Sequence, residues 1–137
     1  MKLSKTSEYA LRILIYMAKE PSSLYSAKKL IEELKISDKY LRRLMTDLSK
    51  AGFIESTQGR DGGYKFAKSI VDIYLFDIVD AIDGMDELND CVLGFETCSC
   101  ENPCAMHDSW LNVRNELSNM FHTTKLSNLD FDKILKY

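Results

Sequence analysis

The sequence lacks any long apolar run. Its apolar stretches are only a few residues long, well short of the about 20 residues that a membrane-spanning helix requires. Charged residues at Glu8 and Arg12 interrupt the N-terminal region before the apolar segment of a signal peptide could be completed. We therefore expect a cytoplasmic protein of 137 residues with no membrane partner, forming one domain or one small domain with an appendage.

A catalytic motif is also missing. The chain has 2 histidines, no phosphate-binding loop of the P-loop type and no pairing of a nucleophile with a base. We therefore expect a protein that is not an enzyme. With 45% hydrophobic and 28% charged residues, the composition is that of a folded protein rather than a disordered one.

Charge is distributed unevenly along the chain. Residues 1–70 contain 14 Lys and Arg against 8 Asp and Glu, whereas residues 71–137 contain 4 against 13. A basic surface attracts phosphates, and an acidic surface is repelled from the same duplex. The basic half is therefore a candidate for nucleic-acid binding, and the alternative is chance clustering of charges on solvated surfaces.

The basic half is predicted to begin with three helices. Apolar residues recur at three- and four-residue steps over 6–19 and again over 27–34. Ser37 is a suitable N-cap for a third helix, and Gly52 is placed to end it. Only three residues connect the second and third helices, and so short a turn forces the steep crossing of a helix-turn-helix.

The third helix is predicted to expose a basic face. In a helix-turn-helix the N-terminal part of this helix meets base edges in the major groove, where arginine can bond guanine through two hydrogen bonds. The alternative is an ordinary solvated helix face. The candidate DNA-binding residues here are Ser37, Lys39, Tyr40, Arg42 and Arg43.

A β-hairpin is predicted directly after these helices. The runs 53–57 and 64–67 are strand-like, and a glycine-rich loop joins them. A hairpin in this position is the wing of a winged helix, with Arg60, Gly62 and Gly63 as further candidates for DNA contact. The alternatives are a generic hairpin and a winged helix that binds protein and has no DNA target.

The acidic half contains a cysteine-rich segment. Cys91, Cys98, Cys100, Cys104 and His107 lie in one 17-residue window, largely within a stretch over 85–102 that has no sustained periodicity. Thiolate and imidazole ligands suit zinc or iron–sulfur clusters. A structural zinc site remains open, as does a metal-free thiol switch through a Cys98–Cys100 or Cys100–Cys104 disulfide.

A long helix is predicted from Pro103, capped by Asn102, to about Phe121. Cys104 and His107 would then share one face of this helix. Its apolar residues recur at alternating steps of four and three, as in a coiled coil, which favours a two-fold dimer; the alternative is packing on its own domain. These residues are Met106, Trp110, Val113, Leu117 and Met120.

A last short helix is predicted to close the core, with Ser127 as its cap and with Leu129, Ile134 and Leu135 as its apolar residues.

The chain resembles a known family over nearly its whole length. It is similar to the Rrf-two family of bacterial winged-helix regulators, which includes the iron–sulfur regulator IscR and the nitric-oxide sensor NsrR. The matching segments are Met1-Lys2-Leu3-Ser4, Tyr9-Ala10-Leu11-Arg12, Ile36-Ser37, Tyr40-Leu41, Lys50-Ala51-Gly52-Phe53-Ile54, Gly59-Arg60-Asp61-Gly62-Gly63-Tyr64, Cys104-Ala105-Met106-His107 with Trp110, and Leu126-Ser127-Asn128-Leu129.

The resemblance implies a homodimeric repressor or activator that binds a near-palindromic site in double-stranded DNA, with an affinity set by an iron–sulfur cluster. It implies that Cys91, Cys98 and Cys104 bind iron. The fourth ligand is implied to be His107, as in IscR-like members with a 2Fe-2S cluster, or the partner subunit's Glu8, as in NsrR-like members. The string from Cys104 to His107 favours the 2Fe-2S arrangement, and 4Fe-4S is the alternative.

Two features depart from the family pattern. In the cysteine-rich segment, six residues separate Cys91 from Cys98 where IscR-like members have five, and Cys100 is an additional thiol that is a candidate substitute ligand. The wing reads Gln58-Gly59-Arg60 where the family more often has Arg before the first Gly. The expected fold is mainly α with a small β-hairpin (α+β). The expected division is a winged helix-turn-helix domain over 1–84, a cluster-binding loop over 85–104, and a dimerisation helix with a C-terminal helix over 105–137.

Overall fold

The computed structural model describes residues 3–133, apart from the side chain of Glu87. The predicted mainly α fold with one small hairpin is confirmed. The helices are α1 (Lys5–Met17), α2 (Ala27–Leu34), α3 (Asp38–Lys50), α4 (Leu75–Ile82) and α5 (His107–Thr123), and the strands are β1 (Ile54–Thr57) and β2 (Gly63–Phe66). Short 3-10 turns η1 to η4 span Ile70–Asp72, Asp86–Asn89, Leu126–Asn128 and Phe131–Lys133.

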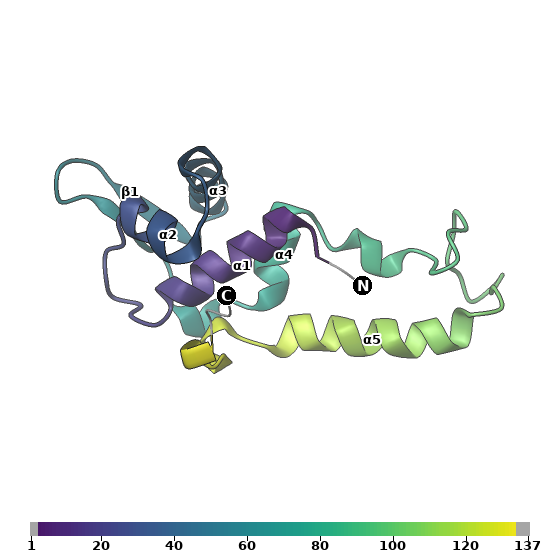
Figure 1. The fold of residues 1–137 in the computed structure, drawn as a ribbon. Coiled ribbons are helices and arrows are strands. Elements are labelled where there is room, and N and C mark those ends of the chain that lie inside the picture. The colour runs from purple at the N-terminus through teal and green to yellow at the C-terminus, as the bar shows by residue number, and fades with distance from the viewer. Residues whose placement is uncertain (1–2, 134–137) are drawn as a thin grey trace.

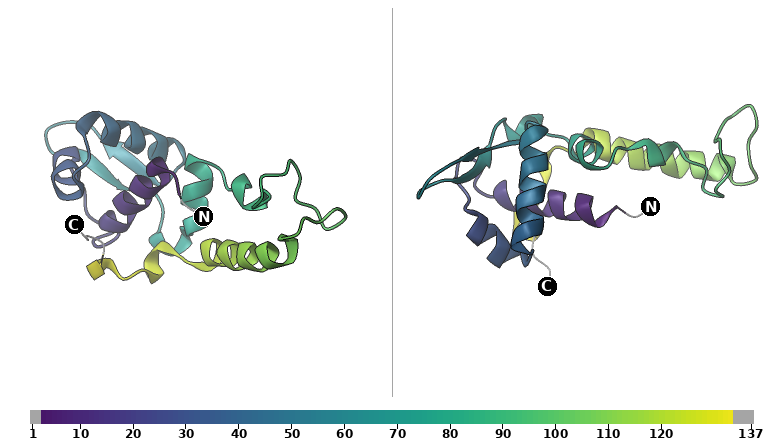
Figure 2. Two further views of the ribbon diagram at one scale, coloured as in Figure 1. Left: turned by 45° about the vertical axis from the view of Figure 1, so that its right-hand side comes forward. Right: turned by 90° about the horizontal axis from the view of Figure 1, so that it is seen from above.

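The helices form a body and an arm (Figure 1). Helices α1 to α4 and the hairpin make up the body. Helix α5 forms the arm: its C-terminal end lies beside the body, and its N-terminal end lies far from the body (Figures 1 and 2). The segment between α4 and α5 extends to that far end and carries the cysteines. Within residues 3–133, no helix is both long and apolar enough to cross a membrane.

Serine caps start each of the first three helices. The hydroxyl oxygens of Ser4, Ser26 and Ser37 accept hydrogen bonds from the backbone N–H three residues ahead, at 3.0, 3.1 and 3.3 Å. These bonds satisfy N–H groups that have no partner inside the helix. Lys35 adopts a left-handed conformation (φ 53°) between α2 and α3, and this turn produces the predicted helix-turn-helix.

The core of the body is built around α1. One face of α1 is buried against the inner faces of α2 and α3, and Leu41, Leu44, Met45 and Leu48 of α3 are all buried. Leu126, at the C-terminal side of α5, is fully buried in the same cluster. The turn that follows α5 therefore packs back onto the first helices.

A second, smaller cluster joins the body to the arm. Its buried residues are Val79 of α4, Met85 and Leu88 of the segment that follows α4, and Phe121 of α5. Leu3 and Leu11, at the N-terminal end of the chain, pack against it. At this junction, the beginning of the segment that carries the cysteines packs against α1.

The wing is an antiparallel hairpin in which Ile54 pairs with Phe66 and Thr57 with Gly63. Tyr25 adds a bridge to its outer edge, because Tyr25 and Tyr64 exchange two backbone hydrogen bonds of 2.8 Å. A Cβ atom at Gly62 would lie 2.0 Å from the carbonyl oxygen of Thr57, and one at Gly63 would lie 2.5 Å from that of Tyr25. Both glycines are therefore required by close approach of the backbone.

Helix α5 begins later than predicted. It starts at His107, after Met106, and not at Pro103. The expected cap residue Asn102 instead uses its backbone N–H to bind the Ser99 hydroxyl at 3.3 Å, which holds the chain in a turn before the helix. Cys104 consequently lies outside α5, and the prediction that Cys104 and His107 share a helical face is wrong.

The predicted C-terminal helix is also different. Ser127 lies inside the 3-10 turn Leu126–Asn128 and does not cap a helix. The amide of Asn128 accepts a hydrogen bond from the Lys125 N–H at 3.1 Å, which stabilises this short turn. Leu129 packs on the core, whereas Ile134 and Leu135 lie outside the described residues.

Replacing Gly62 by alanine should destabilise the wing. The added Cβ overlaps the Thr57 carbonyl, and relieving such an overlap costs about 1–3 kcal/mol of unfolding free energy. Urea denaturation of G62A measures this loss. Ser56→Ala, at an exposed position on β1, is the matched control and should change stability by less than about 0.5 kcal/mol. Equal stability of the two variants would contradict the close approach.

Candidate functional site

The basic face of α3 is open to solvent. Lys39, Arg42 and Arg43 are all exposed, as predicted. The Nε–H of Arg42 donates to Asp38, one turn earlier on the same helix. This exposed ion pair contributes little to stability, but it leaves the two terminal amino groups of Arg42 available as a hydrogen-bonding fork.

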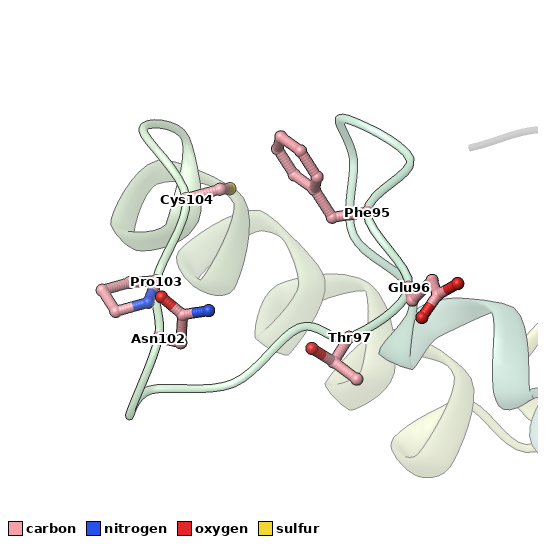
Figure 3. A pocket seen from close by; sticks show the side chains of 6 residues that line it. All are labelled: Phe95, Glu96, Thr97, Asn102, Pro103 and Cys104. Atoms are coloured by element: carbon pink, nitrogen blue, oxygen red, sulfur yellow. The ribbon is translucent and has the colours of Figure 1, made fainter.

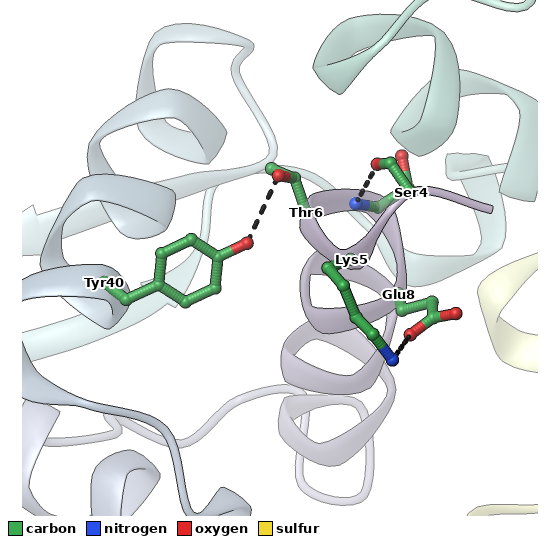
Figure 4. A network of polar contacts seen from close by, with 6 residues as sticks. Ser4, Lys5, Thr6, Glu8 and Tyr40 are labelled. Atoms are coloured by element: carbon green, nitrogen blue, oxygen red, sulfur yellow. Dashed lines mark hydrogen bonds and ion pairs between the residues drawn. The ribbon is translucent and has the colours of Figure 1, made fainter.

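Tyr40 and Ser37 have structural partners. The Tyr40 hydroxyl donates to the Thr6 hydroxyl at 3.2 Å (Figure 4), and its ring contacts Tyr9 edge-on with centroids 5.6 Å apart. The Ser37 hydroxyl caps α3. Tyr40 therefore packs α3 against α1, and its side chain is half-buried.

The wing and α3 enclose a shallow hollow. It is lined by Arg42 of α3, by Ala27 at the start of α2, and by wing residues that include Thr57, Gly59 and Tyr64, with a volume of about 200 Å³. Arg60 is exposed at the tip of the wing. Arg42 therefore borders the hollow on the helix side, and Arg60 lies at the wing tip outside the residues that line it.

The cysteine segment brings its thiols and His107 together in two sets. The Sγ atoms of Cys91 and Cys104 are 3.8 Å apart. The imidazole of His107, which is buried, has Cys98 Sγ 3.7 Å from Nδ1 and Cys100 Sγ 3.4 Å from Nε2. The sequence placed these residues in one window, and the structure divides them into a thiol pair and a thiol–imidazole group.

Backbone N–H groups surround the Cys91 sulfur. Hydrogen bonds from the backbone of Phe95 above all, and also from Leu93 and Gly94, hold the pKa of the Cys91 thiol below its ordinary value despite burial. The N–H of Gly94 also donates to the Cys91 carbonyl at 2.9 Å, and Gly94 then turns the chain with φ +81°. These hydrogen bonds therefore favour the thiolate form of Cys91.

Helix α5 anchors the segment through two residues that the sequence analysis did not assign to the site. The indole N–H of Trp110 donates to the Asp90 carbonyl at 2.9 Å, and the Arg114 guanidinium lies 3.6 Å from Cys98 Sγ. His107, Trp110 and Arg114 are spaced three and four residues apart, so they lie on one face of a helix. This spacing in the sequence could have predicted that Trp110 and Arg114 belong to the site of His107. Figure 3 shows the side chains of Cys104 and Phe95 facing each other across the pocket at the end of the segment.

The distances within each set suit metal ligands. Two thiolates on one tetrahedral ion with bonds of about 2.3 Å lie about 3.8 Å apart, and a thiolate and an imidazole nitrogen lie about 3.6 Å apart. In the part of the chain that the structure describes, however, no three histidine, cysteine or acidic side chains gather around one metal position. The donor chemistry fits a metal centre, and the donors are arranged as separate sets.

Glu8 lies away from these donors within the chain. Its carboxylate forms an ion pair of 3.1 Å with Lys5 on α1 (Figure 4). The cysteine segment extends to the far end of α5, whereas α1 lies in the body (Figures 1 and 2).

Helix α5 leaves an apolar stripe exposed. Met106, Val113 and Met120, each seven residues from the next, are 44%, 50% and 46% exposed. Leu117 instead packs on the junction cluster, and Trp110 is held by Asp90. The predicted coiled-coil face is therefore divided between contacts within the chain and a stripe without a partner among the described residues.

Comparison with known sequences agrees with this architecture. The Rrf2 family, described as iron-dependent transcriptional regulators, matches residues 3–130. The chain belongs to the Rrf2 family. Among Rrf2 relatives, protein rrf2 of Nitratidesulfovibrio vulgaris is 32% identical over 136 residues, covering 98% of this chain and 91% of that protein. The regulator NsrR of Shouchella clausii is 34% identical over 101 residues, covering 73% and 67%.

Solved structures show the same Rrf2 fold. The global cysteine regulator CymR of Bacillus subtilis superposes with a TM-score of 0.78 at 26% identity, covering 95% of this chain and 99% of that chain. The winged-helix assignment and a role in transcriptional regulation, both expected from the sequence, are confirmed by the family. The Rrf2 family is DNA-binding, so DNA is the expected partner of this chain.

Oxidation of the metal-free protein should join Cys91 to Cys104. Their sulfur atoms are 3.8 Å apart, whereas Cys98 and Cys100 are both directed at His107. Diamide treatment followed by peptide mass spectrometry measures the pairing, and Cys91→Ser should abolish the main crosslink while Cys98→Ser should leave it. A dominant Cys98–Cys100 or Cys100–Cys104 bond would contradict the arrangement seen here.

Proposed function

We propose that this Rrf2-family regulator binds DNA as a homodimer and that an iron–sulfur cluster on the cysteine segment sets its affinity. The observation that carries the proposal is the arrangement of the soft ligands: a thiol pair and a thiol–imidazole group, with metal-ligand distances, on a segment attached to a winged helix. A regulator that only bound DNA would not need such a segment.

The proposed DNA interface is the basic face of α3 together with the wing. Arg42, with its fork left available by Asp38, reads base edges, and Lys39 and Arg43 lie beside it. Arg60 reaches a phosphate or the minor groove from the wing tip. Ser37 and Tyr40 act by fixing α3, and Gly62 and Gly63 act by shaping the wing.

The proposed dimer forms along α5. The stripe of Met106, Val113 and Met120 has the seven-residue spacing of a helix pair, and its exposure in a single chain leaves apolar surface to be covered. A second copy related by two-fold symmetry covers it and presents a second α3 helix. The matching DNA target is near-palindromic, with one half-site for each α3.

The proposed ligands are Cys91 and Cys104 for one iron, and Cys98 and His107 for the other. A 2Fe-2S cluster takes two protein ligands on each iron, and two separate sets of donors suit it better than a single zinc ion, which needs four ligands around one point. When bound, the cluster supplies a redox-active centre that crosslinks the segment. Cys100, 3.4 Å from His107 Nε2, is the substitute for Cys98 or His107.

The chain's own residues connect this site to DNA. The ligands lie between α4, which packs on α1, and α5, which carries the dimer stripe. Fixing the segment therefore fixes the orientation of one body relative to the other across the dimer, and with it the spacing of the two α3 helices. A coupling of about 1.4 kcal/mol is enough for each tenfold change in affinity.

Arg42→Ala should weaken DNA binding by about 1–3 kcal/mol, because a bidentate contact to guanine is lost, and should relax preference at one base position. Fluorescence anisotropy with an operator and single-base variants measures both effects. Lys133→Ala, which removes the same charge from the C-terminal turn, is the control and should leave affinity unchanged. Equal effects of the two changes would show that net charge, not base contact, is at work.

Anaerobically purified protein should be coloured, with iron and acid-labile sulfide in near-equal amounts. Cys98→Ala and Cys104→Ala should bleach it, because each removes an iron ligand, and His107→Ala should shift the visible spectrum. Glu8→Ala should leave the spectrum unchanged, and a spectrum that depends on Glu8 rather than on His107 would assign the fourth ligand to the partner subunit. Colourless protein without iron would overturn the cluster.

A second candidate is a metal-free thiol switch through Cys91 and Cys104, favoured by their 3.8 Å separation. A structural neighbour, CymR of Staphylococcus aureus, has been solved in an oxidized form. Metal analysis separates the two, because the switch requires no iron and responds to thiol oxidants alone.

A further inference from the structure

The first turn of α1 makes specific contacts in two directions. On one side, the hydroxyls of Ser4 and Ser7 both donate to a single carboxylate oxygen of Asp83. On the other side, the Thr6 hydroxyl accepts from Tyr40 of α3 at 3.2 Å (Figure 4), and the Tyr9 ring meets the Tyr40 ring edge-on. Four residues close together in sequence therefore touch both α4 and α3.

Asp83 occupies the point where the cysteine segment leaves the body. It is the C-cap of α4, and Gly84, with φ +78°, turns the chain directly after it. Met85 and Leu88 follow and belong to the buried cluster against which Leu3 and Leu11, on either side of the first turn of α1, pack. Cys91 comes three residues after Leu88. Displacement of the cysteine segment therefore acts first on Asp83 and on this packing.

We propose that Asp83 and Tyr40 are positioning residues for DNA binding, linked through the first turn of α1. In this relay, Asp83 holds Ser4 and Ser7, and the neighbouring residues Thr6 and Tyr9 hold Tyr40, so that α3 takes its position from the base of the cysteine segment. The inference rests on the proposed function for its meaning, since it assumes that α3 meets DNA and that the cysteine segment responds to a signal.

Burial makes the link stiff. Ser7 is fully buried, so its hydroxyl has no water to replace Asp83 if the carboxylate moves away. Ser4 is the N-cap of α1 and also accepts from the Ser7 N–H at 3.0 Å, so losing its position unravels the start of the helix. The first turn must therefore follow Asp83 or lose hydrogen bonds, and either outcome changes the support of Tyr40.

Hydrogen exchange on the free, full-length protein tests the relay without DNA or metal. In Asp83→Ala, amide exchange should become about two- to thirty-fold faster in the first turn of α1 and also in the N-terminal half of α3, as expected for a residue on a coupling path. Asp83→Asn keeps an acceptor for the two serines and should restore slow exchange. Asp80→Ala, on an exposed residue of the same helix, is the matched control and should have no effect.

Tyr40→Phe provides a second variant in case Asp83→Ala folds poorly. It removes only the hydroxyl bonded to Thr6 and should accelerate exchange in α3 but not around Asp83. Tyr25→Phe, which removes a hydroxyl bonded to the Glu20 carbonyl at 3.4 Å in the same body, is its control. Unchanged exchange in α3 for both Asp83→Ala and Tyr40→Phe would overturn the relay, as would equal acceleration by the controls.

DNA binding provides the functional measurement. The measured quantity is the ratio of operator affinity between cluster-loaded and cluster-free protein. This ratio should fall about two- to thirty-fold in Asp83→Ala and in Tyr40→Phe. The double variant should lose no more than the larger single loss, because the two residues act in series. Additive losses would overturn the relay. A wild-type protein with no affinity for DNA, or with a ratio of one, would overturn the proposed function, and the exchange result would still decide the relay.

Discussion

Burial of α1 on two sides is the constraint on which the rest of the molecule depends. One face of α1, with Ala10, Ile13, Leu14 and Met17, is enclosed by α2, α3 and the returning C-terminal turn. Its other contacts, through Leu11 and Ser7, meet α4 and the segment that leads to the cysteines. The helix that completes the DNA-binding body is thus also the helix that receives the arm, and neither part can shift without repacking it.

The far end of the arm is held differently. Around the cysteines the contacts are mainly polar: backbone N–H groups on Cys91, the carbonyl of Asp90 on Trp110, and thiols on His107. Phe95 and the neighbouring Val92 and Leu93 are exposed rather than packed. A segment with so little apolar burial is held mainly by these polar contacts, and it opens more easily than the body.

The sequence predicted the winged helix in detail because its signals were local. Serine caps, helical periodicity and the three-residue connection each act over a few residues, and all three helices and the hairpin were confirmed. The predicted start of α5 was wrong. Asn102 and Pro103 are compatible with both a helix start and a turn, and the hydrogen bond from the Asn102 N–H to the Ser99 hydroxyl favours the turn. The pairing of Cys91 with Cys104 was not predicted either, since it depends on how the segment folds back beyond Gly94.

Composition and order of residues by themselves determined that a basic helix-turn-helix with a wing precedes an acidic, thiol-rich segment, because periodicity, capping and charge are properties of neighbours in the chain. Only the tertiary structure decided that Tyr40 supports α3 from α1, that Gly62 and Gly63 are required by backbone contacts, and that Asp83 binds the first turn of α1. The contacts of Tyr40 and Asp83 join residues far apart in sequence, and the two glycines leave no space for a Cβ atom beside a neighbouring backbone. Both depend on how the elements pack together, which no local sequence pattern determines.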